Sequence, residues 1–299
     1  MDASLLKSIT EKINSSCQLS LPLLIAEGVR GGDICDSYHL QDPNKQYHFF
    51  VKTHQKECEH LFKNEYNSLL AIQKTRTIRS PKAITFGTHA ASSFLVLEHL
   101  LFSHQDNNKL LGQQLACLHK SKKTTSPHFK FGFFENNFIG TTPQLNTPSD
   151  DWSHFWIHQR LQPQIELAYQ NGFKQQLQPL ENSLFEASET LLKNHQPTSS
   201  LLHGDLWGGN KAFLTDGTPV IFDPACYYGD RETDIAMTRL FGGFSEAFYS
   251  NYNKEWPLPE GSQKREPLYN LYHQLNHLNL FGSGYLDTCI NTIQNLVRQ

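Results

Sequence analysis

Residues 201–210 read LLHGDLWGGN and place Asp205 five residues before Asn210. An aspartate in such a loop can accept the proton of an attacking hydroxyl, and an asparagine at this spacing can hold a magnesium ion that bridges phosphates. The stretch fits the H-x-D-L-x-x-x-N pattern that is typical of a kinase catalytic loop. Because so short a pattern also arises by chance, its interpretation depends on what the rest of the chain places around it.

A second signal is the run KAFLTDGTPVIFD, which ends at Asp223. Asp216 and Gly217 form a typical turn pair between two apolar stretches, so the run predicts a β-hairpin. Because a hairpin folds back, we expect Asp223 to return close to Asn210, where two oxygen ligands can share one Mg²⁺. The alternative is that Asp223 only caps a strand before Pro224.

A third signal lies upstream, in the order glycine turn, lysine, glutamate. Gly31 and Gly32 form a turn between two expected strands. Lys52 ends a short strand, and Glu65 lies near the middle of the helix that follows. Such a loop can cover phosphates, the lysine can neutralise their charge, and the glutamate can hold the ammonium group in position. Each feature also has an ordinary explanation, as a turn, a strand edge or a surface charge. Glu57 and Glu59 are alternatives to Glu65 as the residue that holds the lysine.

The composition excludes several classes of protein. With a formal net charge of −3 and no long basic run, the 299-residue chain lacks the clustered Lys and Arg that nucleic-acid phosphates require. No apolar stretch approaches the length of a membrane span, and the N-terminus lacks the apolar core of a signal peptide, so we expect a cytoplasmic protein. The six cysteines are widely spaced and the 15 histidines show no compact ligand spacing, which argues against disulfides and a structural metal.

The elements expected to position these residues divide into a strand-rich part and a helical part. The expected strands lie within 27–40, at 46–52, around Ile84 and at 93–100, and the expected helices at 5–13, 57–74, 106–120, 151–170, 174–194, 231–241, 244–252, 265–281 and 284–298. Residues 125–150 are expected to form an ordered loop, because their Phe side chains would otherwise be exposed. We therefore predict an N-terminal nucleotide-binding lobe, residues 1–100, and a C-terminal catalytic and substrate-binding lobe, residues 101–299.

Three stretches together resemble the fructosamine kinase, or ketosamine-3-kinase, family: LLHGDLWGGN, FDPACYYGDRETDIAMTRLFGGF and the residues from FGFFENNFIG through DDWSHFW to RL. The resemblance covers nearly the whole chain and is densest in residues 131–163 and 201–244. It implies an α+β, bilobal protein-kinase-like fold, related to aminoglycoside phosphotransferases and choline kinases, with a small antiparallel-sheet N-lobe and a larger helical C-lobe. It also implies ATP-dependent phosphorylation of the 3-hydroxyl of a ketose joined to an amine, which gives an unstable product and so recovers the amine.

The resemblance carries roles to individual positions. On the nucleotide side it implies a catalytic base at Asp205, magnesium ligands at Asn210 and Asp223, a phosphate-anchoring pair at Lys52 and Glu65, a phosphate-covering turn at Gly31 and Gly32, and backbone contacts to adenine at Glu98, His99 and Leu100. On the acceptor side it implies stacking of Trp207 on the sugar and a substrate-facing position for Asn136, Asn137 and Trp152, with structural positions as the alternative for all four. His203 is expected to orient the loop, and Asp234 to accept its backbone N–H groups.

Two other functions remain open at this stage. The same scaffold serves aminoglycoside- and choline-type kinases, whose cationic substrates would favour an acidic pocket. A nucleotide-binding pseudokinase is a third possibility, although all the expected catalytic elements are present in the sequence. The implied partners are ATP, Mg²⁺ and a free or protein-bound ketosamine, with no nucleic acid and no membrane, and the oligomeric state is not predicted.

Overall fold

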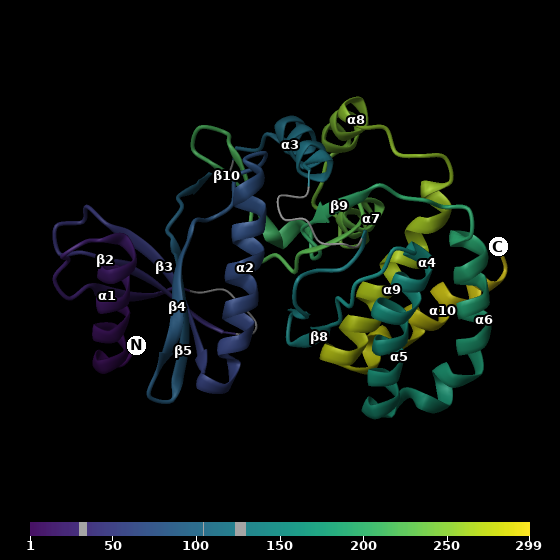
Figure 1. The fold of residues 1–299 in the computed structure, drawn as a ribbon, viewed down its shortest axis with the longest axis horizontal. Coiled ribbons are helices and arrows are strands. Elements are labelled where there is room, and N and C mark those ends of the chain that lie inside the picture. The colour runs from purple at the N-terminus through teal and green to yellow at the C-terminus, as the bar shows by residue number, and fades with distance from the viewer. Residues whose placement is uncertain (30–34, 104, 123–129) are drawn as a thin grey trace. The chain divides into compact units, whose positions relative to one another are not determined.

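The computed structural model describes residues 1–29, 35–103, 105–122 and 130–299. The chain divides into two compact units. The first comprises Met1–Asn107 together with the later segment Ala212–Pro224, and the second comprises Asn108–Lys211 and Ala225–Gln299. The first unit therefore takes in a hairpin from far along the chain, in addition to the N-terminal residues (Figure 1).

The first unit is built on a five-stranded antiparallel sheet with the strand order β1-β2-β3-β5-β4. Its elements are α1 (Ala3–Cys17), β1 (Ile25–Val29), β2 (Asp36–Gln41), β3 (His48–Gln55), η1 (Lys56–Cys58), α2 (Glu59–Thr75), β4 (Ala83–His89), β5 (Ser92–Glu98), β6 (Phe102–Ser103) and, from the returning segment, β10 (Lys211–Leu214) and β11 (Pro219–Ile221). The expected turn between the last two strands is present, with Gly217 at φ +82°.

The two faces of this sheet are covered by different helices, α1 on one side and α2 on the other (Figure 1). Successive residues of a strand point to opposite faces. On β3, Phe49 and Val51 pack in the cluster that includes α1, and Phe50 packs in the cluster that includes α2. The same alternation directs Lys52 to the α2 face, so the strand register decides which helix can supply its partner.

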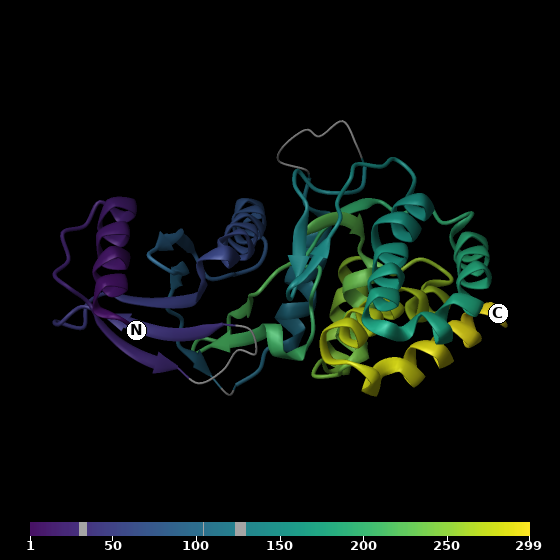
Figure 2. The ribbon, with the colours of Figure 1, turned by 90° about the horizontal axis from the view of Figure 1, so that it is seen from below.

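The second unit is mainly helical. Its elements are α3 (Asn108–Lys120), β7 (Asn137–Ile139), β8 (Thr142–Gln144), α4 (Trp152–Trp156), η2 (Ile157–Leu161), α5 (Gln162–Ala168), η3 (Tyr169–Phe173), α6 (Lys174–Leu192), β9 (Ser199–Leu202), η4 (Gly208–Asn210), β12 (Tyr227–Asp230), α7 (Glu232–Leu240), α8 (Glu246–Glu255), α9 (Ser262–Phe281), η5 (Ser283–Tyr285) and α10 (Leu286–Val297). Helix α9 contacts α5, α7 and α10 and is buried over much of its length. Figure 2 shows the teal and yellow helices of this unit from a second direction.

Each expected helix has a counterpart, and the expected strands of the first unit are present. The break expected after residue 170 falls at Gly172, whose φ of +95° interrupts the helical path from α4 to α6. The strand pairs that were not expected include β9 with β12, and β7 with β8 inside the predicted loop at 125–150, of which residues 125–129 lie outside the described residues. These strands have three or four residues each, too few to show a period of two. No helix in the described part of the chain is both long and apolar enough to cross a membrane.

Helices α3 and α8 approach so closely that they tolerate only a glycine at position 112. A Cβ atom on Gly112 would lie 2.3 Å from the carbonyl oxygen of Phe248. Alanine normally stabilises a helix interior relative to glycine, but here the overlap dominates, so we expect Gly112→Ala to lower the free energy of unfolding by about 1–3 kcal/mol. Urea denaturation followed by circular dichroism measures the effect. The control is Gly284→Ala, whose Cβ would meet nothing within 4 Å; equal stabilities of the two variants would refute the packing argument.

Candidate active site

In the first unit, Lys52 lies between two carboxylates. Its ammonium group donates to Glu65 Oε1 on α2 at 2.8 Å and to Asp223 Oδ1 at 2.6 Å. The pair of Lys52 and Glu65 is the one expected from the sequence, and Glu65, rather than Glu57 or Glu59, supplies it. The contact with Asp223 was not expected, because the sequence suggested either a magnesium ligand or a strand cap there.

Burial and charge act against each other in this cluster. Burial alone would lower the pKa of Lys52, but the carboxylates of Asp223 and Glu65 outweigh it and raise that pKa, so the ammonium stays charged. Burial raises the pKa of Glu65 to about 7, although the Lys52 charge opposes this. Asp223 has φ +58°, a left-handed conformation that aspartate adopts more readily than most residues. The backbone at Asp223 is therefore held in an uncommon shape beside the lysine.

The expected nucleotide contacts are only partly described. Gly31 and Gly32 lie outside the described residues. The backbone N–H of Glu98 donates to the carbonyl of Lys82, and its carboxylate binds Arg79. The side chain and N–H of Glu98 are thus engaged within the unit, so a contact to adenine from this segment would use the Glu98 carbonyl or the neighbouring residues His99 and Leu100.

In the second unit, the loop that carries Asp205 follows directly after β9. Gly204 has φ +83°, and a Cβ on it would lie 2.1 Å from the carbonyl oxygen of Ala225. The N–H of Ala225 donates to the carbonyl of His203 at 2.8 Å. The N–H of Asp205 points to Nδ1 of His203 at 3.3 Å. The buried His203 is therefore part of the loop's internal framework, as the sequence suggested.

Asp234 accepts hydrogen bonds from the backbone of the same loop. Its Oδ2 accepts the N–H of His203 at 2.8 Å and its Oδ1 accepts the N–H of Gly204 at 2.9 Å. His119 on α3 contacts Oδ2 through Nε2 at 3.1 Å. The carboxylate is 1% exposed, and burial alone would raise its pKa, but the bonds from His119 and the loop lower it below the usual value. The ionised carboxylate thus fixes two consecutive amides of the loop.

Asn210 ties the end of the loop back to Asp205. Its Nδ2 donates to the carbonyl of Asp205 at 2.8 Å and to Oδ2 of the same residue at 3.2 Å. This leaves Oδ1 of Asn210 as the atom that suits a hard cation such as Mg²⁺. Asp223 belongs to the first unit and Asn210 to the second, and each is described within its own unit, so a shared magnesium ion stays a prediction.

The double glycine of the loop lies in a tight turn, in which the N–H of Asn210 donates to the carbonyl of Trp207 at 3.0 Å, and it also allows close packing. A Cβ on Gly209 would lie 2.2 Å from the ring of Trp207, which folds over it. A Cβ on Gly208 would lie 3.1 Å from the carbonyl oxygen of Gly242. The residue of this loop with a positive φ is Gly204 instead. The side chain of Trp207 itself is 41% exposed, which argues against a purely structural position.

Two residues expected on the substrate side are buried. Asn137 donates through Nδ2 to the carbonyl of Cys226 and accepts at Oδ1 from Gln144 and Asn146. Trp152 is packed among aromatic rings and donates from Nε1 to the hydroxyl of Tyr269 at 3.0 Å. The structure gives both side chains a supporting position, and this burial disfavours a direct contact with substrate.

The third such residue, Asn136, also has a structural bond. Its Oδ1 accepts the backbone N–H of Asn146 at 2.7 Å. Asn146 is in turn bound by Arg160, whose side chain is fully buried and whose guanidinium carbon lies 4.0 Å from the ring centroid of Tyr227. Loop 131–149 is thereby joined to the strand that follows Cys226. The sequence did not single out Arg160, because an isolated arginine is ordinarily a surface residue.

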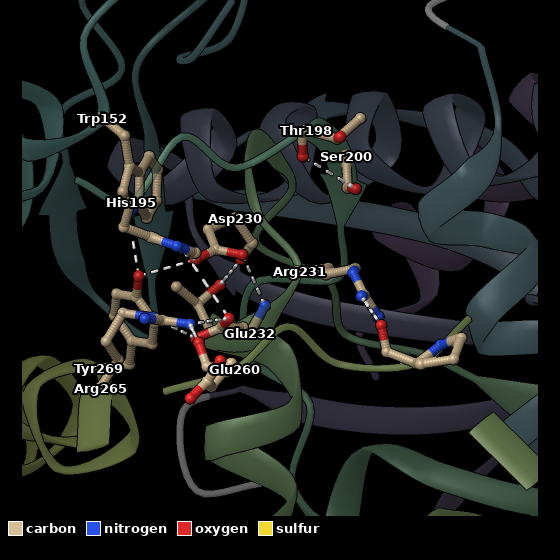
Figure 3. Close-up of polar contacts among 12 residues, drawn as sticks. Trp152, His195, Thr198, Ser200, Asp230, Arg231, Glu232, Glu260, Arg265 and Tyr269 are labelled. Carbon is tan, nitrogen blue, oxygen red and sulfur yellow. Dashed lines mark hydrogen bonds and ion pairs between the residues drawn. The ribbon is translucent and has the colours of Figure 1, made fainter. Parts of the chain in front are cut away.

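A buried polar cluster anchors the start of α7, the helix that carries Asp234 (Figure 3). Asp230 Oδ2 contacts His195 Nε2 at 2.6 Å and accepts from the Tyr269 hydroxyl at 2.7 Å. Glu232 makes two bonds to Arg265, at 2.8 and 2.7 Å. The ligand atoms of His195, Asp230 and Glu232 lie within 4.8 Å of one another, but the Arg265 charge already neutralises Glu232. The cluster therefore holds α7 in place without requiring a cation.

The chain is similar to known proteins over nearly its whole length. A family model described as fructosamine kinase matches residues 5–299. A protein of Synechocystis sp. named as a probable ketoamine kinase is 40% identical over 98% of this chain and 97% of its own length. The chloroplastic protein-ribulosamine 3-kinase of Arabidopsis thaliana is 40% identical over 90% of this chain and 82% of its own length.

Solved structures agree with this grouping. A Haemophilus somnus protein provisionally described as a fructosamine-3-kinase superposes with a TM-score of 0.86 at 26% identity, covering 97% of each chain. A spectinomycin phosphotransferase superposes with a TM-score of 0.55 at 12% identity, covering 98% of this chain and 96% of its own. The second likeness shows the fold alone. Together they confirm the expected α+β protein-kinase-like fold.

The raised pKa of Glu65 predicts a pH-dependent stability. Between the unfolded value of 4.5 and the folded value of about 7, the folded protein holds a proton that the unfolded chain has released. This contribution is fully present below pH 4.5 and is lost as the pH rises through 7. Relative to Glu65→Gln, the wild type should lose about 1–3 kcal/mol of unfolding free energy from pH 5 to pH 8 in urea denaturation. The control is Glu186→Gln, because Glu186 is exposed. If the unfolding free energies of wild type and Glu65→Gln changed in parallel with pH, the raised pKa of Glu65 would be contradicted.

Because Asp234 accepts two backbone N–H groups of the loop, we predict that its negative charge slows hydrogen exchange at these two amides. In Asp234→Asn, one of the two carboxylate oxygens becomes a donor, so the N–H groups of His203 and Gly204 cannot both be accepted. We expect faster hydrogen exchange at these amides and a loss of about 2–4 kcal/mol in unfolding free energy. Asp216→Asn is the control, since Asp216 also accepts a backbone N–H, from Thr218, but in an exposed turn. Unchanged exchange at both amides would exclude this role.

Proposed function

The chain belongs to the fructosamine kinase family, and we propose that it transfers the γ-phosphoryl group of ATP to the 3-hydroxyl of a ketose joined to an amine. The observation that carries this proposal is the loop around Asp205, whose backbone is fixed by the buried carboxylate of Asp234 and by the side chain of Asn210. A loop held in this way keeps a carboxylate at one place relative to an acceptor hydroxyl, which is what phosphoryl transfer requires of the protein.

In the proposed reaction Asp205 orients the 3-hydroxyl and takes its proton. The hydroxyl oxygen forms a bond to the γ-phosphorus as the bond between that phosphorus and ADP breaks. The proton passes to the Asp205 carboxylate and from there to solvent. Trp207 offers an exposed ring two residues from Asp205, suited to lie against the sugar. The amine-linked 3-phosphate formed is unstable, so the amine is released from the sugar.

The nucleotide is assigned to the first unit. Lys52 remains charged and offers its ammonium group to phosphate oxygens, with Glu65 holding it in position. Asp223 in the first unit and Asn210 in the second would each offer an oxygen donor of the hard kind that Mg²⁺ prefers, a carboxylate and a carboxamide. When bound, the ion would neutralise phosphate charge as the bond to ADP breaks. The phosphate-covering turn at residues 31–32 and the adenine contact at residues 98–100 are part of the same proposal.

The acceptor is proposed as a ketosamine on chemical grounds, in agreement with the ketoamine and ribulosamine kinases among the relatives. It can be a free small molecule or attached to a protein, and we place the reaction in the cytoplasm. An aminoglycoside- or choline-type kinase shares only the fold at low identity. A pseudokinase is disfavoured because Lys52, Glu65, Asp205 and Asn210 are all present and the first two are paired.

The decisive experiment replaces the proposed base. Asp205→Asn should lower kcat with a small fructosamine by about 10²–10⁴-fold, because a general base contributes that much, while the affinity for ATP changes little. Steady-state kinetics and nucleotide titration measure the two quantities, with Asp216→Asn as the control. Phosphorus NMR of the wild-type product locates the phosphate. Turnover of aminoglycosides or choline but of no ketosamine would disprove the proposed acceptor, and wild-type turnover in Asp205→Asn would disprove the role of Asp205.

A further inference from the structure

Five aromatic rings of the second unit form a continuous row that starts at the catalytic loop. Trp207 meets Phe241 edge-on with ring centroids 6.4 Å apart, and Phe241 lies 4.8 Å from His277. His277 contacts Phe281 at 5.4 Å and Tyr285 at 5.2 Å. We call these five residues the aromatic row. It leads from two residues beyond Asp205 to the C-terminal end of α9 and the η5 turn.

Three large aromatic side chains of the row are exposed to solvent, although such side chains are usually buried. Trp207 is 41% exposed, Phe241 43% and Phe281 59%, while His277 and Tyr285 are half-buried beneath them. Single exposed apolar residues are common on protein surfaces, but a contiguous set commonly marks a binding surface. The three exposed rings are joined through His277 and so form one surface.

The backbone is shaped to build this surface. Gly208 and Gly243 approach so closely that a Cβ on Gly243 would lie 3.0 Å from the Cα of Gly208. This approach brings Phe241, two residues earlier, against Trp207. His277 and Phe281 are four residues apart on α9 and therefore share a helix face.

The row is apolar and uncharged at neutral pH. The Nδ1–H of His277 donates to the carbonyl of His273 at 2.8 Å, and burial lowers the pKa of the His277 imidazole. The neutral ring fills the space between Phe241 and Phe281 without adding charge. The row therefore suits an apolar or aromatic group rather than an acidic one.

The proposed reaction places such a group beside the row. In a ketosamine the amine is attached to C1, so its nitrogen lies three bonds from C3, the carbon whose hydroxyl faces Asp205 in the proposed reaction. Trp207 is the adjacent exposed side chain. Resting on the proposed function, we propose that the aromatic row is the subsite for the amine-side substituent and selects ketosamines with an apolar or aromatic amine.

The test compares two fructosamines that differ only in the amine. One is made from methylamine, which ends near Trp207, and the other from 4-phenylbutylamine, whose longer chain and phenyl ring can lie along the row beyond Trp207. Wild type should show a KM about ten-fold or more lower for the phenylbutyl adduct, with similar kcat, because covering aromatic surface contributes to binding alone. Equal KM values for the two adducts would overturn the proposal.

Variants of single rings test which residues cause the lower KM for the phenylbutyl adduct. Phe241→Ala and Phe281→Ala should each raise KM for the phenylbutyl adduct about five- to ten-fold more than KM for the methyl adduct, while Phe281→Tyr should retain the preference. Val297→Ala, which truncates an exposed residue on α10 outside the row, is the control. Equal losses for both adducts in the alanine variants would mean that the rings only support the fold, and would overturn the subsite.

This design separates the two proposals. Turnover of the methyl adduct without any preference would overturn the aromatic row and leave the kinase function standing. Turnover of neither adduct would overturn the ketosamine function and the subsite with it.

Discussion

The second unit depends on one buried carboxylate. Asp234 accepts the N–H groups of two consecutive loop residues, and a carboxylate can do this only while ionised, although burial favours the neutral form. The contact from His119 and the amide dipoles of the loop outweigh that penalty. The position of Asp205 is thereby linked to a helix whose start is anchored by an independent polar cluster around Asp230 and Glu232. The position of the Asp205 carboxylate is therefore set by groups that would not themselves touch the acceptor in the proposed reaction.

In the first unit, the main buried charge is the ammonium group of Lys52. The buried Lys52 contacts two carboxylates, the largely buried Glu65 and the more exposed Asp223. The pKa of Glu65 rises to about 7 because burial disfavours its charged form; Lys52 opposes this rise and the neighbouring Asp223 adds to it. A phosphate group arriving at Lys52 would join a site that is already ordered, so little reorganisation is needed.

The sequence determined the order and kind of most elements, since helices and strands of five or more residues carry a visible hydrophobic period. It also indicated the proposed chemistry, because Asp205, Asn210, Lys52 and Glu65 stand at spacings typical of phosphoryl transfer. LLHGDLWGGN with its tryptophan is far more specific than the bare kinase pattern. The pairing of Lys52 with Glu65 followed from their order along the chain and from the strand register.

Only the tertiary structure decided what depends on contacts between distant segments. The burial of Asn137 and Trp152, expected near substrate, follows from the packing of loop 131–149 against β12 and α9. The close packing of Gly208 is also tertiary, since a Cβ there would meet the carbonyl oxygen of Gly242. The aromatic row joins positions 207, 241, 277, 281 and 285. Local sequence encodes backbone preference and side-chain chemistry, but which side chains are covered is set by long-range packing that no short window of residues contains.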